Sequence, residues 1–161
     1  MPLDRDTIAF LESGQIAMYA SCADAARAPR VARVYGCRLG EPGGALAIWV
    51  ARPAADALLD ALEATGRIAV VGSHIATLKT FQLKSARARA RVPGPNDSAA
   101  VRAYCAAFVR AGVAAGYREP LLRSVIDCDP SAIARIELTL DAAFMQTPGP
   151  GAGAAIAGAT R

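Results

Sequence analysis

Runs of alternating or continuous hydrophobic residues in this chain are interrupted by segments with helical spacing. Five short apolar or alternating runs predict strands at residues 15–21, 30–39, 45–51, 68–71 and 133–141. Apolar residues three and four apart predict helices at residues 3–13, from Pro53 to Gly66 and at 97–116, with a helical turn at 120–126. The order lacks the regular strand–helix alternation of a parallel sheet. It predicts a mainly β domain, a small antiparallel barrel with flanking helices.

The stretch from Gly66 to Val92 has the most informative pattern. Ile68 to Val71 is an apolar run that predicts a strand covered on both faces. From Thr77 to Val92 the side chains alternate between two faces, and both faces change character near Ser85. We therefore expect a hairpin whose second strand is long and bends or bulges near Ser85, a feature that often directs side chains toward a site.

The segment TLKTFQLK, which follows an apolar strand and a helix, resembles the corresponding strand of the pyridoxamine 5'-phosphate oxidase-like flavoproteins. The resemblance covers roughly residues 5–150 and includes the early segment PRVARVYGCRL and the late segment LDAAFMQTPGPGAG. It implies an FMN-binding split barrel that forms a homodimer, with the flavin in a groove between two subunits. Ser85 stands where the family commonly has glycine.

The resemblance also implies which residues bind the cofactor. FMN needs cations for its phosphate and hydrogen bonds along the polar edge of its ring, which arginine, lysine and amide side chains supply. The matching positions are Arg30, Arg33, Trp49, Arg52, Lys79, Thr80, Gln82 and Lys84. Among them, Arg30, Arg52 and Lys79 are the phosphate candidates.

Thr80 and Gln82 are the expected partners of the ring, and Lys84 shares their face of the strand. After the third strand, the better-characterised oxidases carry a Ser-Arg-Lys cluster, whereas this chain has ARPAAD and keeps only Arg52 of it. The structural alternative for each basic residue is a solvated strand face. For Gln82, a binding role and a structural role are equally supported.

The resemblance predicts an oxidoreductase that acts on an unknown small molecule, in which the flavin carries the redox chemistry. Two alternatives remain open. One is the same fold with a deazaflavin or haem, and the other is a cofactor-free dimer that serves as a binding or sensing module. The chain has no readable Ser/His/Asp or Cys/His arrangement, so catalytic residues are not assigned.

Size and composition fit one domain. With 161 residues, of which 53% are hydrophobic, we expect a domain at 1–150 and a tail at 151–161, after the prolines and glycines that follow Thr147. The net charge of +4 raises the question of a polyanionic partner. However, alternating Arg and Ala after Ser85 is typical of a solvated edge strand, and aromatics are only 6% of the chain, so nucleic-acid binding is not expected.

Location and metal binding are predicted from what the sequence lacks. It has acidic residues where a signal peptide has a basic and then an apolar run, and it has no apolar stretch of membrane-spanning length, so we expect a cytoplasmic protein without a membrane partner. Its four cysteines show no CxxC spacing and His74 is its single histidine, so no metal site is expected.

Overall fold

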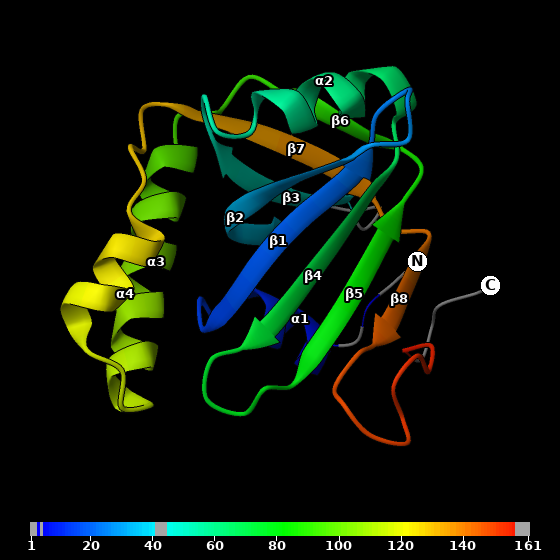
Figure 1. The fold of residues 1–161 in the computed structure, drawn as a ribbon. Helices are drawn as coiled ribbons and strands as arrows, with labels where there is room; N and C mark the ends of the chain where they lie inside the picture. Colours follow the sequence, from blue (N-terminus) through cyan, green and yellow to red (C-terminus); the bar gives the residue numbers. More distant parts are fainter. Residues whose placement is uncertain (1–2, 4, 41–44, 157–161) are drawn as a thin grey trace.

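A computed structural model describes residue 3 and residues 5–40 and 45–156 (Figure 1). The helices are α1 (Arg5–Glu12), α2 (Asp56–Thr65), α3 (Asp97–Ala114) and α4 (Glu119–Ile126). The strands are β1 (Ile16–Ala23), β2 (Pro29–Leu39), β3 (Ala45–Ala51), β4 (Ile68–His74), β5 (Thr80–Ser85), β6 (Ala88–Arg91), β7 (Ile133–Thr139) and β8 (Ala142–Met145). The turn expected at Glu41–Gly44 lies outside the described residues.

All the strands belong to one antiparallel sheet, in the order β6-β7-β3-β2-β1-β4-β5-β8. The strands β5 and β6 follow each other in the chain, yet β5 pairs with β4 and β8 whereas β6 pairs with β7. The short link between them therefore joins β5, which lies next to the edge strand β8, to β6, the strand at the opposite edge. The backbone N–H of Ala88 donates to the carbonyl of Gly66 at 2.9 Å, and the sheet curls into a split barrel.

The expected bend near Ser85 is confirmed, but the single long strand is wrong. Phe81, Leu83 and Ser85 are buried, and the next buried residue is Ala88, so the inward-facing parity changes across the link. The reason lies in the hydrogen bonds of the link: the Asp141 carboxylate accepts the Ala86 N–H at 2.6 Å and an Arg87 guanidinium N–H at 2.7 Å. A side chain, and not a neighbouring strand, satisfies the backbone there.

Two further expectations differ from the structure. The helix expected from Pro53 begins at Asp56, because the Asp56 N–H donates to the Pro53 carbonyl in a preceding turn. The strand β8 was not predicted, since four residues before a proline- and glycine-rich segment carry little pattern. After β8, the Ile156 N–H donates to the carbonyl of Ala143, so the described chain stays bonded to this strand. The domain boundary at residue 150 stays a prediction.

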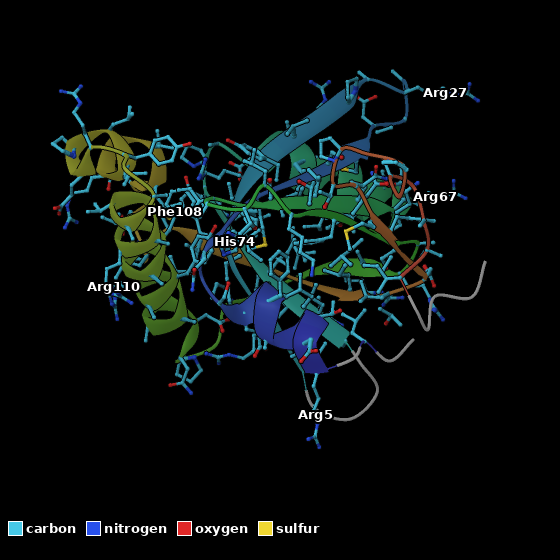
Figure 2. All side chains as sticks on the ribbon, turned by 90° about the horizontal axis from the view of Figure 1, so that it is seen from below. Arg5, Arg27, Arg67, His74, Phe108 and Arg110 are labelled. Atoms are coloured by element: carbon cyan, nitrogen blue, oxygen red, sulfur yellow. The ribbon has the colours of Figure 1, made fainter. Side chains whose placement is uncertain are left out.

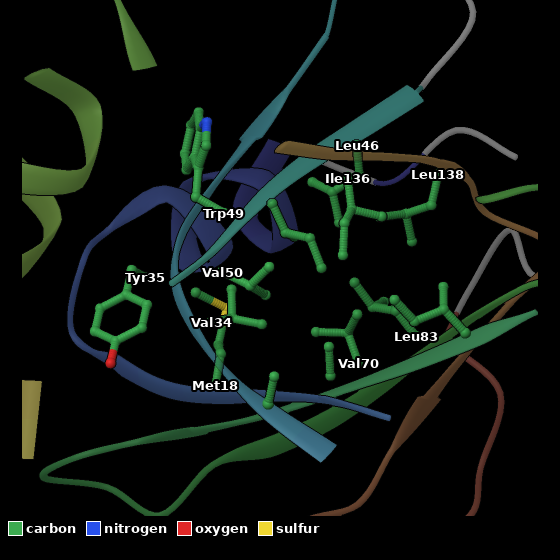
Figure 3. Close-up of a cluster of buried hydrophobic side chains, with 14 of the residues drawn as sticks. Met18, Val34, Tyr35, Leu46, Trp49, Val50, Val70, Leu83, Ile136 and Leu138 are labelled. Carbon is green, nitrogen blue, oxygen red and sulfur yellow. The ribbon is translucent and has the colours of Figure 1, made fainter. Parts of the chain in front are cut away.

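The core fills the barrel with aliphatic side chains (Figure 3). Its largest fully buried members include Met18, Leu46, Ile48, Leu83, Ile136 and Leu138. Trp49 points away from this cluster, toward the side of the sheet on which α3 packs (Figure 3). A Cβ on Gly36 would lie 3.1 Å from the Tyr104 Cβ and 3.3 Å from the Trp49 ring, so glycine permits this close approach of α3.

The helices cover the sheet unevenly. α3 packs against β2, α2 contacts β1, β2 and β6, and α1 contacts β2 (Figure 1). None of the four described helices lies over the outer face of β1, β4, β5 and β8 (Figure 1). The expectation that β4 is covered on both faces is therefore wrong: Ile68 and Val70 are buried, but Val71 is 39% exposed.

The packing around β4 predicts that Gly72→Ala destabilises the protein by about 1–3 kcal/mol, because a new Cβ overpacks the core. That Cβ would lie 2.5 Å from a Phe81 ring carbon and 2.8 Å from an Ile16 methyl carbon. Urea unfolding followed by circular dichroism measures the change. Gly151→Ala is the matched control, because nothing lies within 4 Å of its Cβ position. Equal stability of Gly72→Ala and the wild type would contradict the predicted clash.

The link after β5 predicts a pH-dependent contribution to stability. The Ala86 N–H, and then the Arg87 guanidinium, hold the pKa of Asp141 below its usual 3.8. The folded state therefore favours the carboxylate, and its contribution is present above pH 3.8 and is lost as the pH falls below that value. Urea unfolding should find Asp141→Asn less stable than the wild type at neutral pH, with the difference shrinking in acid. Asp60→Asn, on the exposed side of α2, should follow the wild-type curve, whereas a pH-independent deficit in Asp141→Asn would argue against the charge.

Candidate functional site

The uncovered part of the sheet brings the polar candidates of several strands together. We call it the open face: the outward side chains of β1, β4, β5 and β8, with those of the adjoining part of β2. Strand register places one residue from each strand in a single row, which runs Arg33, Tyr19, Val71, Gln82 and Phe144. Val31 and Tyr19 are 59% and 43% exposed, so the face combines apolar surface with hydrogen-bonding groups.

Arg33 has an unusual environment for a charged side chain. Its guanidinium carbon lies 5.4 Å from the centre of the Tyr19 ring and 5.3 Å from that of Phe108, which lies between α3 and the sheet (Figure 2). One terminal nitrogen donates to the Tyr19 hydroxyl at 2.9 Å. Nε and Nη2 are buried and have no hydrogen-bond partner among the described residues. A rigid guanidinium with unused donors fits a phosphate or carboxylate oxygen.

The other basic candidates have partners nearby. Arg30 pairs with Asp24 at 2.7 Å, and its hydrogen bond lowers the pKa of that carboxyl. Arg52 faces Asp56 at 3.3 Å. An anionic ligand at either arginine would compete with the carboxylate already there.

The two candidate lysines lie over aromatic rings. The Lys79 ammonium is 5.2 Å from the centre of the Phe10 ring, and the Lys84 ammonium is 5.2 Å from that of Phe144. Phe144 belongs to the row on the open face, so Lys84 is part of that face. Lys79 precedes β5 and lies outside the row.

Thr80 and Gln82 stay together with Lys84 on the open face, as the alternation of the strand predicted. The Thr80 hydroxyl donates to the Leu78 carbonyl at 2.8 Å and lies 2.9 Å from the Ser73 hydroxyl. Among the described residues, the Gln82 side chain makes one long hydrogen bond, in which its oxygen accepts from the Gln146 amide at 3.5 Å. The Gln82 amide is therefore largely available to a ligand.

Trp49 lies apart from these residues. It is buried between the sheet and α3, and its indole N–H has no partner among the described residues. The sequence-based set also missed Val71 and Phe144, which flank Gln82 through strand pairing. It missed Tyr19, which pairs with Val71, and Gln146, whose side-chain amide contacts Gln82. The alternation of residues 16–23 could have placed Tyr19 on the exposed side of β1, since Ile16, Met18 and Ala20 form the buried side. Gln146 follows the unpredicted β8.

The cysteine thiols and the histidine are not grouped as a reactive or metal-binding site among the described residues. All four cysteines are free, and burial raises the pKa of Cys37 to about 12 and that of Cys128 to about 11. His74 Nδ1 accepts the N–H groups of Ala76 and Thr77, each at 3.2 Å. Within the described ranges, no three His, Cys, Asp or Glu residues are grouped so as to hold a metal ion.

No described helix is both long enough and apolar enough to cross a membrane.

Comparison with known proteins supports the fold. No family model and no curated protein matches the sequence. The crystal structure of HupZ from Group A Streptococcus matches with a TM-score of 0.53 at 15% identity, over 94% of this chain and 100% of that chain. At this identity, the match shows a shared fold alone.

Two other solved structures match at TM-scores of 0.49. One is a pyridoxamine 5'-phosphate oxidase-related, FMN-binding protein from Nostoc punctiforme, 13% identical over 94% of this chain and 87% of its own. The other is HutZ, the haem storage protein from Vibrio cholerae, 12% identical over 90% of this chain and 95% of its own. The curled antiparallel sheet, its strand order and the HupZ match together show that this chain has the split-barrel fold that the TLKTFQLK resemblance predicted.

Proposed function

We propose that this chain is a cytoplasmic flavoprotein that binds FMN on its open face and transfers electrons or hydride between the flavin and a small molecule. The observation that carries the proposal is Arg33, a cation with two buried and unused donors at the edge of that face. Among the described carboxylates, none forms an ion pair with it. A flavin phosphate would supply the missing acceptors through charge-assisted hydrogen bonds once the guanidinium turns so that these buried nitrogens face the ligand.

The same face offers the groups that an isoalloxazine ring requires. Gln82 can donate to and accept from the polar edge of the ring, and the Thr80 hydroxyl lies two residues away on the same side of β5. Val71, next to Gln82 in the row, offers an apolar surface to the ring. When bound, the flavin supplies the redox chemistry, and these residues hold and orient it.

A second copy of the chain is the proposed cover for the open face. Tyr19, Val31 and Val71 expose apolar surface that a partner would remove from water. A homodimer with the cofactor between two open faces would shield the flavin from water. In such a dimer, the phosphate and the ring need not contact the same subunit, so Arg33 and Gln82 can act across the interface.

The alternatives are a deazaflavin or haem in this fold, or a cofactor-free binding or sensing dimer. A deazaflavin would use the same open face, because it has a similar tricyclic ring. Haem finds less support: the single histidine, His74, already accepts two backbone N–H groups through Nδ1. The absorbance spectrum of the purified protein distinguishes bound flavin, deazaflavin or haem from a protein that binds none of them.

Purified protein incubated with excess FMN and then desalted should keep the visible absorbance of oxidised flavin. Arg33→Met should weaken FMN binding about tenfold or more, since a hydrogen bond to a charged group contributes about 1.5–3 kcal/mol. Gln82→Ala should weaken it less, because a neutral hydrogen bond contributes about 0.5–1.5 kcal/mol. Arg5→Met, on the distant helix α1, is the matched control and should bind as the wild type does. A folded wild-type protein that retains no FMN would overturn the proposal. Binding of another chromophore would favour a deazaflavin or haem in this fold.

The homodimer is tested by light scattering, which should find twice the 16.6 kDa mass of the chain. Val71→Glu should yield the monomer and reduce FMN retention, because a charge would be buried in the interface. Val125→Glu is the matched control: Val125 lies on α4 and is 45% exposed, close to the 39% of Val71, but is remote from the open face. A monomeric wild type, or equal effects of the two variants, would rule out this interface.

A further inference from the structure

The open face contains a hollow of about 590 Å³ beside the row of Gln82. Register places Ser21 opposite Ala69, Ala69 opposite Lys84 and Lys84 opposite Ala142. On each strand the side chain lies two residues, or about 7 Å, from its counterpart in the row of Tyr19, Val71, Gln82 and Phe144, toward the same end of the sheet. The hollow exists because small side chains here adjoin a row of larger ones. Its lining includes Ser21, Cys22, Ala23, Pro29, Ile68, Ala69, Ala86 and Ala142.

Two cations border this apolar surface. Lys84 is opposite Ala69 in the ladder, Arg67 directly precedes β4, and both residues line the hollow. Figure 2 shows Arg67 projecting from the surface, and no described carboxylate forms an ion pair with it or with Lys84.

The carboxylate in the lining does not neutralise these cations. Asp141 directs one oxygen to the Ala86 N–H at 2.6 Å and the other to the Arg87 guanidinium at 2.7 Å. The hollow is therefore apolar at its floor and positively charged at its rim. This arrangement complements a molecule with an apolar body and an acidic group.

We propose that the hollow binds a small organic anion, a carboxylate or phosphate with an apolar body, whose acidic group lies between Arg67 and Lys84. Binding requires no flavin. One consequence rests on the proposed function: a flavin ring at Gln82 would adjoin the hollow, and its ligand would then be the substrate of the flavoprotein. Lys84 would then contact this ligand and not the cofactor.

Binding of 1-anilinonaphthalene-8-sulfonate, an aromatic anion, to flavin-free protein tests the site. Fluorescence titration should find that Arg67→Gln and Lys84→Gln each weaken binding by up to about fivefold, the upper end of the range for exposed charges, and that the double variant weakens it further. Ala69→Leu should weaken it at least as much by filling the hollow without changing the charge. Arg5→Gln, on α1, removes the same charge at another part of the surface (Figure 2) and should leave binding unchanged.

Several results would overturn the proposal. Unchanged binding in the double variant, or equal loss in Arg5→Gln, would mean that the probe does not use these cations. If each bound FMN molecule displaces one probe molecule, the hollow is the cofactor site. If the probe still binds to FMN-saturated protein, the hollow is a site separate from that of the cofactor. Binding that disappears as the protein dimerises would mean that the second copy fills the hollow. A protein that binds the probe but retains no FMN would support the hollow and refute only the flavin proposal.

Discussion

The short link between β5 and β6 is the constraint on which the rest of this fold depends. A chain that continued straight after Ser85 would lengthen β5 between β4 and β8, but here it turns and pairs with β7 at the other end of the sheet. Asp141 makes the turn possible because its carboxylate takes the Ala86 N–H and the Arg87 guanidinium. Ala88 then bonds to Gly66, and the core is enclosed.

With the core enclosed, helices cover one part of the outer surface of the barrel. The other part is free to contact a ligand or partner. α3 takes the side of β2 and β3, where Gly36 lets Tyr104 approach Trp49. β1, β4, β5 and β8 keep their outward side chains uncovered by helices. The hydrogen-bonding side chain of Gln82 and the apolar side chains of Tyr19 and Val71 therefore share one surface, although they come from three strands.

Local pairing distinguishes the candidate arginines from one another. Arg30 and Arg52 resemble Arg33 in sequence context, but each has a carboxylate within ion-pair distance. Arg33 is held by two aromatic rings and a hydroxyl instead, which fixes its position without neutralising its charge. An arginine in this condition is better prepared to bind an anion, since no ion pair must first be broken.

The sequence by itself determined the strands and helices with clear periodicity, because alternation and three-and-four spacing report burial directly. It also placed Thr80, Gln82 and Lys84 on one face, and the TFQLK resemblance indicated the fold. Only the tertiary structure decided that residues 77–92 form two strands, since their separation depends on a carboxylate more than fifty residues away. It also separated Trp49 from the open face and brought Tyr19 to it. Such groupings arise from strand register and helix packing, which join residues that no local pattern connects.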